Sequence, residues 1–245
     1  MALPKSNGLV FYRGPSQLDG KPIVAIITGV KRHSDNIKTG DLLQTWILPQ
    51  SPFPTQARKD GTISSVCGNC KYQKFKMCYV NTKCGVGGVF KCWKSKGYPV
   101  LNKKNIKLLH RHNLRIGSFG DPTSIPMKSW QPVLSACKSS VGYTHQWSTC
   151  DQRFKNICMA SVDNRKEYFQ AKQKGWRTFR VRLPGEVVLK SEMICPASNH
   201  KTTCEKCLSC CGLKQAKRKS VVIVVHGEKW KIRNFRRFRK VKLEV

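Results

Sequence analysis

Acidic residues are scarce in this chain of 245 residues: 13 Asp and Glu face 46 Lys and Arg, leaving a formal net charge of +33. A folded domain with so much charge of one sign repels itself, and a polyanion relieves that repulsion. Nucleic acid is the commonest polyanion in a cell. We therefore expect a nucleic acid, DNA or RNA, as partner; an anionic membrane surface and a merely basic soluble protein are the alternatives.

Long apolar runs are also lacking. No run approaches the roughly 20 residues that span a bilayer, so we expect no membrane span. The first residues, MALPKSNGLVFYRG, hold no apolar stretch of signal-peptide length, and the expected location is cytoplasmic. Apolar residues still make up 40% of the chain, with ten Phe and six Trp. That content excludes global disorder and is enough for a sizeable core.

The thirteen cysteines are an odd number, which argues against a complete disulfide framework. Thiols in the cytosol stay reduced, so cysteines at short spacings are interpreted as metal ligands. The sharper group has the pattern C-x8-C-x2-C-x2-C, with Cys211 alongside. It consists of Cys195, Cys204, Cys207 and Cys210. Four thiolates in such a short segment can hold zinc or an iron–sulfur cluster.

An earlier group contains Cys67, Cys70 and Cys78, with Cys84 and Cys92 following. With Cys84, the first three could close a zinc site. Alone, they would leave one iron of a four-iron cluster open, as a catalytic cluster requires. The cofactor is therefore an Fe–S cluster or Zn, and both groups could also supply one site. Three further cysteines are expected to be buried structural thiols: Cys137, Cys150 and Cys158.

Alternating apolar segments predict an α/β fold, with a mostly parallel sheet or partial barrel, cysteine-rich metal-binding loops and a basic C-terminal tail. The predicted strands are 23–30, 42–49, 114–119, 141–145, 157–162, 178–183 and 221–225. Helical spacing is predicted for 126–137 and 164–175. We divide the chain into an α/β domain, 1–227, with cysteine-rich insertions at 67–92 and 195–211, and a basic aromatic tail, 228–245.

Polar residues follow several predicted strands, where parallel sheets place their chemistry. The catalytic candidates are Asp121, His145, Asp163 and His226. The first three are expected to line one cleft, although Asp121 could instead cap a turn. Tyr143-Thr144-His145 could supply a nucleophile and a base, and a packed strand end is the alternative. The pair His110 and His112 superficially matches a metal-binding histidine motif of rolling-circle nucleases.

The tail carries eight Lys or Arg between residues 229 and 242, with no acid and three interleaved aromatics, Trp230, Phe235 and Phe238. Cations contact phosphates while aromatic faces stack on bases; a solvated element whose aromatics pack on the domain is the alternative. The nucleic-acid-binding candidates are Lys229, Trp230, Lys231, Arg233, Arg236, Arg237, Arg239 and Lys240.

Several segments occur here in a recognisable order: KTGDLLQTWILP, VCGNC, CYVN, RIGSFGDPTSIP, GYTHQW, CMASVDN, GWRTFRVR, CPAS and TTCEKCLSCCG. In this the chain resembles a family of bacteriophage-encoded cysteine-rich proteins of unassigned function. It is distantly similar to radical-SAM-like phage proteins, those likened to radical S-adenosylmethionine enzymes. The resemblance implies a host-cell cytoplasmic location and raises the iron–sulfur interpretation, although the Cys-x3-Cys-x2-Cys spacing of ordinary radical S-adenosylmethionine enzymes is absent.

Three functional hypotheses follow. The first is a phage accessory protein that binds nucleic acid and carries cysteine-ligated metal centres, with a role in replication or gene expression. The second is an iron–sulfur, radical-SAM-like enzyme that modifies a nucleic acid or nucleotide in the cleft at the strand ends. The third is a rolling-circle-type nuclease, which needs a metal-bound histidine pair near a tyrosine.

Overall fold

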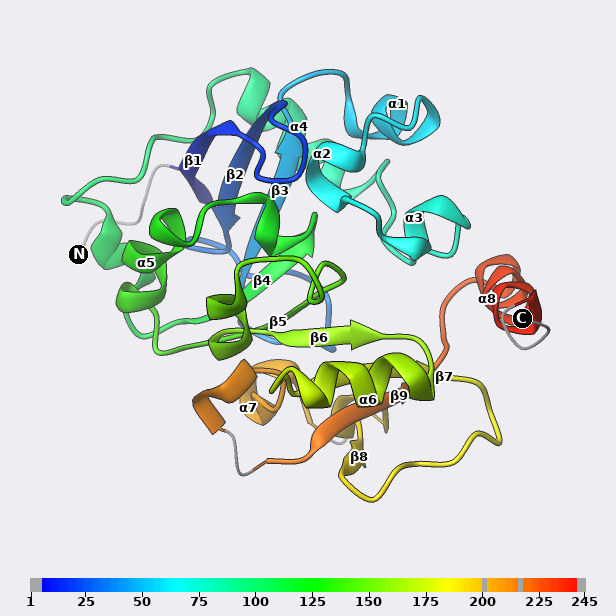
Figure 1. The fold of residues 1–245 in the computed structure, drawn as a ribbon. Helices are drawn as coiled ribbons and strands as arrows, with labels where there is room; N and C mark the ends of the chain where they lie inside the picture. Colours follow the sequence, from blue (N-terminus) through cyan, green and yellow to red (C-terminus); the bar gives the residue numbers. More distant parts are fainter. Residues whose placement is uncertain (1–5, 200–201, 216–217, 242–245) are drawn as a thin grey trace.

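The computed structural model describes residues 6–199, 202–215 and 218–241. They form an α/β fold around one nine-stranded sheet with the order β1-β2-β3-β4-β5-β6-β7-β9-β8 (Figure 1). The strands are β1 Gly8–Pro15, β2 Pro22–Thr28, β3 Leu43–Pro49, β4 Asn113–Phe119, β5 Ser139–Thr144, β6 Met159–Val162, β7 Thr178–Arg182, β8 Glu192–Ile194 and β9 Ser220–Val224.

Most of the sheet is parallel, as the sequence predicts. The pairings β1–β2 and β2–β3 are antiparallel, and every pairing from β3 to β8 is parallel. The sheet is open, with β1 and β8 at its edges, so the described residues form no closed barrel. Strand β2 lies between two neighbours and is buried at six of its seven positions, which explains its unbroken apolar run.

The helices are mostly short. They are α1 Pro54–Lys59, α2 Ser64–Cys67, α3 Lys71–Lys74, α4 Gly85–Lys94, α5 Met127–Ala136, α6 Arg165–Gln173, α7 Cys204–Cys207 and α8 Lys229–Val241. Short 3-10 turns join them: η1 Ile106–Leu109, η2 Pro122–Ser124, η3 Gln152–Asn156, η4 Pro196–Asn199 and η5 Gly212–Gln215. The predicted helices correspond to α5 and α6. No helix in the described part of the chain is long and apolar enough to cross a membrane.

Helix α6 shows how local sequence sets a boundary. The Asn164 side chain accepts a hydrogen bond from the Glu167 backbone N–H at 2.8 Å, and the Glu167 carboxylate accepts one from the Asp163 N–H at 2.9 Å. This reciprocal cap satisfies donors that a helix start leaves unpaired. It fixes the start of α6 directly after β6, and therefore also fixes Asp163 at the carboxyl end of that strand.

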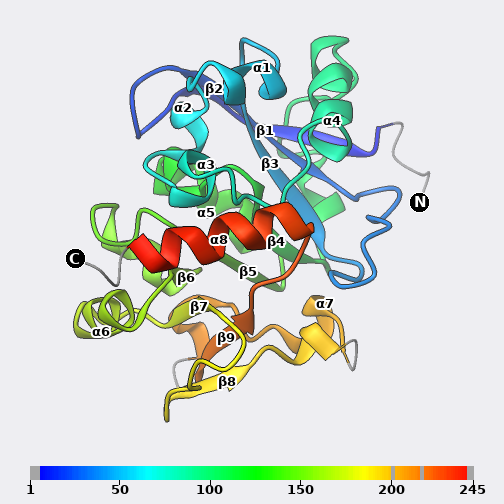
Figure 2. The same cartoon turned by 90° about the vertical axis from the view of Figure 1, so that its right-hand side faces the viewer.

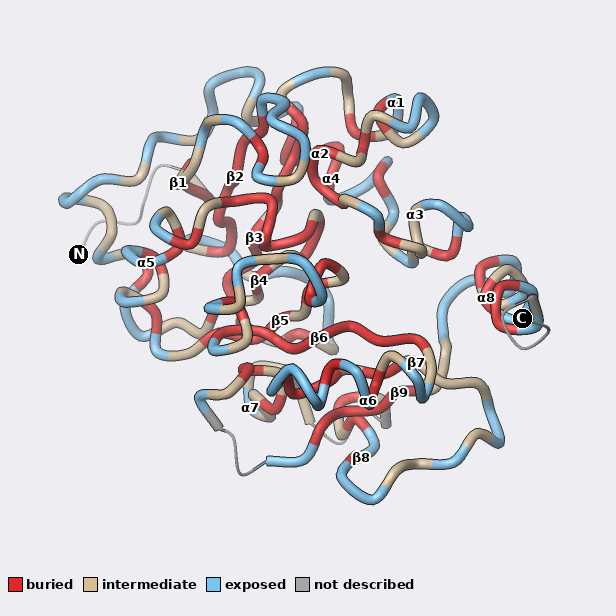
Figure 3. Tube along the Cα trace, viewed as in Figure 1, coloured by how far each residue is buried: buried red, intermediate tan, exposed pale blue. Residues whose placement is uncertain are grey.

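The main core lies along the sheet and buries its strands on both faces (Figure 3). A smaller apolar cluster forms where Met77 meets Phe235 and Phe238 of α8. Viewed from the side, α8 lies across the carboxyl ends of the central strands (Figure 2). The described part of the predicted tail is thus a helix packed on the α/β body; residues 242–245 lie outside the described residues.

Candidate functional site

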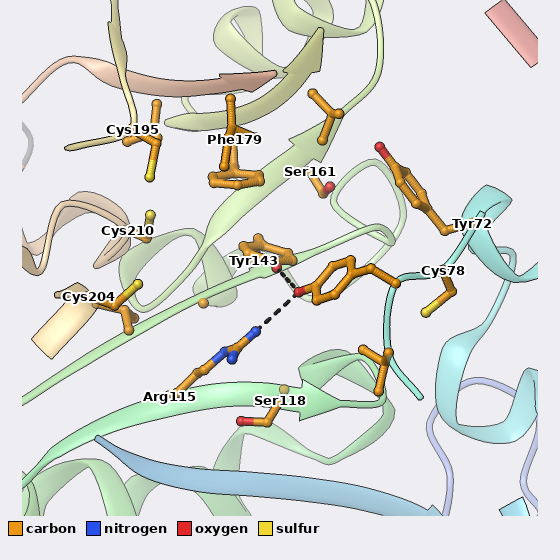
Figure 4. A pocket seen from close by; sticks show the side chains of 18 of the residues that line it. Tyr72, Cys78, Arg115, Ser118, Tyr143, Ser161, Phe179, Cys195, Cys204 and Cys210 are labelled. Carbon is orange, nitrogen blue, oxygen red and sulfur yellow. Dashed lines mark hydrogen bonds between the residues drawn. The ribbon is translucent and has the colours of Figure 1, made fainter. Parts of the chain in front are cut away.

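A cavity of about 320 Å³ lies at the carboxyl ends of the parallel strands. Residues of both cysteine groups line it, from opposite sides (Figure 4). Strands β4, β5, β7 and β9 supply its walls, and α8 contributes Lys231 and Phe235. This is where a parallel sheet concentrates function, because the loops that follow successive strands converge there.

The first group reaches the cavity through Cys67, Cys70 and Cys78. Cys67 ends α2 and Cys70 precedes α3, and the Cys70 N–H donates to the Cys67 carbonyl at 3.2 Å. Burial, followed by the neighbouring thiols, raises the pKa of Cys67 well above its usual value. Cys84 and Cys92 lie at the start and within α4, outside the cavity lining. Of the four cysteines that could form a closed zinc site, three therefore line the cavity and Cys84 does not.

Arg58 of α1 lies beside this group and forms no ion pair with any described acidic residue. Its Nη1 donates to the Val80 carbonyl at 3.2 Å. Its Nε and Nη2 are buried and have no hydrogen-bond partner among the described residues. The guanidinium acts against burial and lowers the pKa of Cys67 and Cys78. A buried cation with unused donors costs free energy unless an anion faces it, and a metal–thiolate group is such an anion.

The second group enters the cavity from the segment between β8 and β9. Cys195 follows β8, and Cys204 and Cys207 bound α7. Figure 4 shows the sulfurs of Cys195, Cys204 and Cys210 pointing toward one another. Burial and then the other three thiols raise the pKa of Cys210. The backbone of this segment is fastened to the sheet, because the Gly142 N–H donates to the Cys210 carbonyl at 3.0 Å.

A second buried guanidinium, that of Arg177, supports the turn after these cysteines. It donates to the carbonyls of Gly212 and Ser209 at 2.8 and 2.9 Å, and one N–H faces the Cys211 sulfur at 3.9 Å. It forms no ion pair within the described residues. Cys211 is itself buried and does not line the cavity.

Two tyrosines and an arginine stand between the cysteine groups. The Tyr79 and Tyr143 hydroxyls are 2.6 Å apart, and Arg115 Nη2 donates to the Tyr79 hydroxyl at 3.1 Å (Figure 4). Burial and the nearby Tyr79 raise the pKa of Tyr143 well above its usual value. Tyr143 is therefore a neutral phenol hydrogen-bonded inside the cavity, which does not match an activated nucleophile.

Asp121 follows β4, and its carboxylate is fully engaged. Oδ1 accepts from the Thr123 N–H, the Thr123 hydroxyl and the Thr144 hydroxyl at 3.1, 2.8 and 2.7 Å. Oδ2 accepts from the His145 N–H at 2.8 Å. The side chain thus caps η2 and joins the ends of β4 and β5. Its place in the cavity wall is as predicted, but its oxygens perform the capping role that was the alternative.

His145 lines the cavity beside Cys70, and its ring packs against Tyr72 with centroids 5.2 Å apart. Burial lowers the pKa of His145, but the anionic groups around it, led by Cys70, outweigh burial and raise the pKa to about 9. Asp163 lies behind the cavity and is absent from its lining. The prediction that both line one cleft with Asp121 therefore holds for His145 alone.

Asp163 is 1% exposed. Its Oδ1 has no hydrogen-bond partner in the described part of the chain, and its Oδ2 lies 3.6 Å from Lys71 Nζ. Burial raises the pKa of this carboxyl, while His145 and Lys71 lower it. His226, the fourth candidate, lines the cavity rim, where its ring stacks on Tyr79 and its Nδ1 lies 3.1 Å from the Val224 carbonyl.

The remaining histidine motif lies elsewhere. His110 is exposed and His112 precedes β4, at the amino ends of the strands. The ring of His112 lies 5.7 Å from that of His33. Neither histidine lines the cavity that contains Tyr143 and the cysteines, so the described residues do not bring this pair to a tyrosine there, as a rolling-circle nuclease requires.

Helix α8 divides the predicted nucleic-acid-binding residues between two faces. Phe235 and Phe238 are buried in the apolar cluster, at 0% and 6% exposure, so they are not available to stack on bases. Lys231 pairs with Glu228 at 2.8 Å and Arg239 pairs with Glu186, so these two also face the protein. The exposed residues are Lys229, Trp230, Arg233, Arg236, Arg237 and Lys240.

Cys137 and Cys158 are buried, and Cys150 is half-buried. Burial raises the pKa of all three, to about 12 for Cys137 and Cys150. Within the described ranges, no three His, Cys, Asp or Glu side chains are arranged to hold a single metal ion as they stand. Sequence reasoning missed Arg58, Arg115 and Tyr79, because their roles depend on contacts between distant segments.

Comparison of the chain with protein-family models, with curated proteins and with solved structures found no match. The resemblance to phage proteins consequently stays a prediction.

Proposed function

We propose that the chain is an iron–sulfur enzyme that modifies a nucleic acid or nucleotide. The observation that carries this proposal is that Cys67, Cys70 and Cys78 line a cavity at the carboxyl ends of parallel strands. Three thiolates would leave one iron of a four-iron cluster without a protein ligand, and such an iron supplies catalytic chemistry when the cluster is bound. The second group, Cys195 to Cys210, faces the same cavity and would hold a second centre.

A multi-metal cluster does not require its ligands to converge on one ion. Thiolates around one zinc ion must converge on bonds of about 2.3 Å, and the described residues form no such compact shell. The ligands of a cluster stand farther apart, because several metal and sulfide atoms lie between them. The unused donors of Arg58 provide hydrogen bonds for the negative charge of a thiolate-bound cluster.

Anaerobic purification with elemental analysis tests the proposal. We expect brown protein with absorption near 400 nm and stoichiometric iron and sulfide. Cys70→Ser should remove iron from the first site, and Cys207→Ser from the second. Cys92→Ser is the matched control, since Cys92 does not line the cavity. Colourless protein containing zinc would favour zinc centres, and protein without any bound metal would overturn the proposal.

A phage accessory protein that binds nucleic acid without catalysis is the second candidate, with a role in replication or gene expression. The exposed basic face of α8 favours it, because five cations there have no acid among the residues of that helix. The two candidates differ in one measurement: metal-free protein should bind nucleic acid as tightly as metal-loaded protein if the centres only stabilise the fold.

A further inference from the structure

Apart from its cysteines, the cavity is lined by more cationic side chains than carboxylates. Lys38, Arg115 and Lys231 line it, and Asp121 is the single carboxylate among the described lining residues. The Asp121 oxygens are engaged by backbone and hydroxyl donors, and Lys231 already pairs with Glu228. Arg115 has no ion pair within the described residues. Arg115 therefore lacks a carboxylate partner among the described residues, and an anionic group of a ligand can take that place.

Arg115 is placed to receive that group. Its side chain extends from β4 into the cavity toward the two tyrosines (Figure 4), where Tyr79 accepts one of its hydrogen bonds. A guanidinium carries five N–H donors in a planar fork, and a neutral phenol does not cancel its charge. Such a fork matches the oxygens of a phosphate, which is why arginine is preferred at phosphate sites.

The wall next to Arg115, formed by β5, β7 and β9, suits a flat apolar body. The rings of Tyr143 and Phe179 stack with centroids 4.6 Å apart and planes 14° apart, and Val181 and Ile223 continue this surface. Aromatic faces of this kind stack on nucleobases of any sequence. A volume of about 320 Å³ is at the small end for ligand pockets, so between the two cysteine groups the cavity has space for no more than one such unit.

Helix α8 connects the cavity to the outside. Its inner face contributes Lys231 and Phe235 to the cavity wall. Its outer face carries a stripe of exposed cations at helical spacing: Lys229, Arg233, Arg236, Arg237 and Lys240. One helix therefore forms both the cavity wall and the cationic stripe, and Figure 2 shows this helix lying across the central strands.

We propose that the cavity binds one nucleotide of a nucleic-acid strand. Its phosphate lies on Arg115, its base lies against Tyr143 and Phe179, and the flanking strand follows α8. Enzymes that act on a base within a strand take that base out of the stack into such a pocket. This nucleotide site rests on the proposed function, in which the substrate binds in the cavity lined by the cysteines.

Binding measurements on the full, anaerobically purified chain test this site. The probes are thymidine, thymidine 5′-monophosphate and single-stranded octathymidylate. We expect the monophosphate to bind about 10- to 100-fold more tightly than the nucleoside, as a charge-assisted contact gives. Arg115→Gln should remove that difference, and Arg115→Lys should retain part of it. Arg13→Gln, on the edge strand β1, is the matched control and should leave the affinity for the nucleoside and the monophosphate unchanged. Arg237→Gln should weaken the binding of octathymidylate alone.

Equal affinity for nucleoside and monophosphate, or an Arg115→Gln variant that binds the monophosphate normally, would overturn the nucleotide site. Circular dichroism of each variant, with Arg115→Lys as the charge-retaining form, separates loss of folding from loss of the contact. Metal content is measured on the same samples. If the protein takes up no metal but binds nucleotide, the proposed iron–sulfur enzyme is overturned and the nucleotide site is kept. If the protein is fully loaded with metal but binds no nucleotide, the nucleotide site is overturned and the metal centres are kept.

Discussion

A single carboxylate, that of Asp121, holds the ends of β4 and β5 together by accepting four hydrogen bonds. Asp121→Asn keeps the shape but turns an amide N–H₂ toward a donor, leaving at least one buried N–H or O–H unsatisfied. We expect a loss of about 1–3 kcal/mol in the free energy of unfolding, measured by urea denaturation. Asp19→Asn is the control, because the Asp19 carboxylate is exposed and accepts a hydrogen bond from the Lys21 N–H at 3.1 Å.

An unchanged free energy of unfolding in Asp121→Asn would change the role assigned to Asp121. A variant with normal stability that binds nucleotide but does not modify it would show that this carboxylate acts on the substrate.

Another residue-scale prediction concerns His145, whose pKa is raised to about 9 by surrounding anionic groups, against the effect of burial. A raised folded-state pKa means that the native protein binds the proton more tightly than the unfolded chain. The resulting stabilisation is complete below about pH 6.5 and is lost as the pH rises through about 9. In metal-free protein, His145→Gln should therefore flatten the fall in unfolding free energy over this window.

The raised pKa values of the buried thiols make stability fall in the same direction, so the measurement is the difference between wild type and His145→Gln. Identical pH profiles for the two proteins would show that His145 gains no proton on folding. His226→Gln serves as the control, since burial lowers the pKa of that histidine.

At the scale of an element, α8 presents its cations on one outer face. Changing Lys229, Arg233, Arg236 and Arg237 to Gln should flatten the salt dependence of duplex DNA binding by roughly three to four units of slope. The reason is that each phosphate contact that is lost reduces the number of counterions released on binding. Trp230, which is 49% exposed, is free to stack on unpaired bases. Trp230→Ala should therefore weaken single-stranded binding more than duplex binding.

A matched set of four exposed lysines away from α8 provides the control: Lys103, Lys104, Lys107 and Lys128. If the α8 variant keeps its affinity and its slope while the control variant loses both, nucleic acid binds elsewhere on the molecule.

The elements predicted correctly are those with a strong local signal. The apolar run at 23–30 became β2 because a strand buried on both faces requires such a run, and Asn164 with Glu167 marked the start of α6 through its cap. Strand β1 was missed because its burial is uneven along its length. Helix α8 was left undecided between strand and helix, since cations occupy most of its positions and only Phe235 and Phe238 mark its inner face.

The candidate site was predicted in part. Short spacing identified the cysteine groups, and strand ends indicated where polar residues gather. The convergence of Cys67 and Cys204 on one cavity depends on strand order, which local sequence does not encode. Arg58 and Arg115 belong to the site only through packing between distant segments, so no spacing rule could have singled them out.

For the molecule as a whole, the scarcity of acids determines how its charge is arranged. Some of the few carboxylates are used inside the fold: Glu192 forms a buried pair with Arg180 at 2.6 Å, and Glu186 holds α8 through Arg239. Most surface cations consequently have no acidic neighbour to offset them. Their mutual repulsion opposes the compact state and is weakened by salt.

This arrangement predicts that salt stabilises the fold while it weakens nucleic-acid binding. Raising NaCl from about 0.05 to 0.5 M shortens the Debye length from more than 10 Å to well below it. We expect Tm to rise by roughly 3 °C or more, which corresponds to about 1 kcal/mol for a chain of this size. The α8 variant with four Gln should show a smaller rise, because it starts with less repulsion. A duplex oligonucleotide should raise Tm at the low salt concentration and lose that effect at the high one. A Tm that is independent of NaCl in both proteins would show that the cations lie too far apart to destabilise the fold, and would remove self-repulsion as a reason to expect a polyanionic partner.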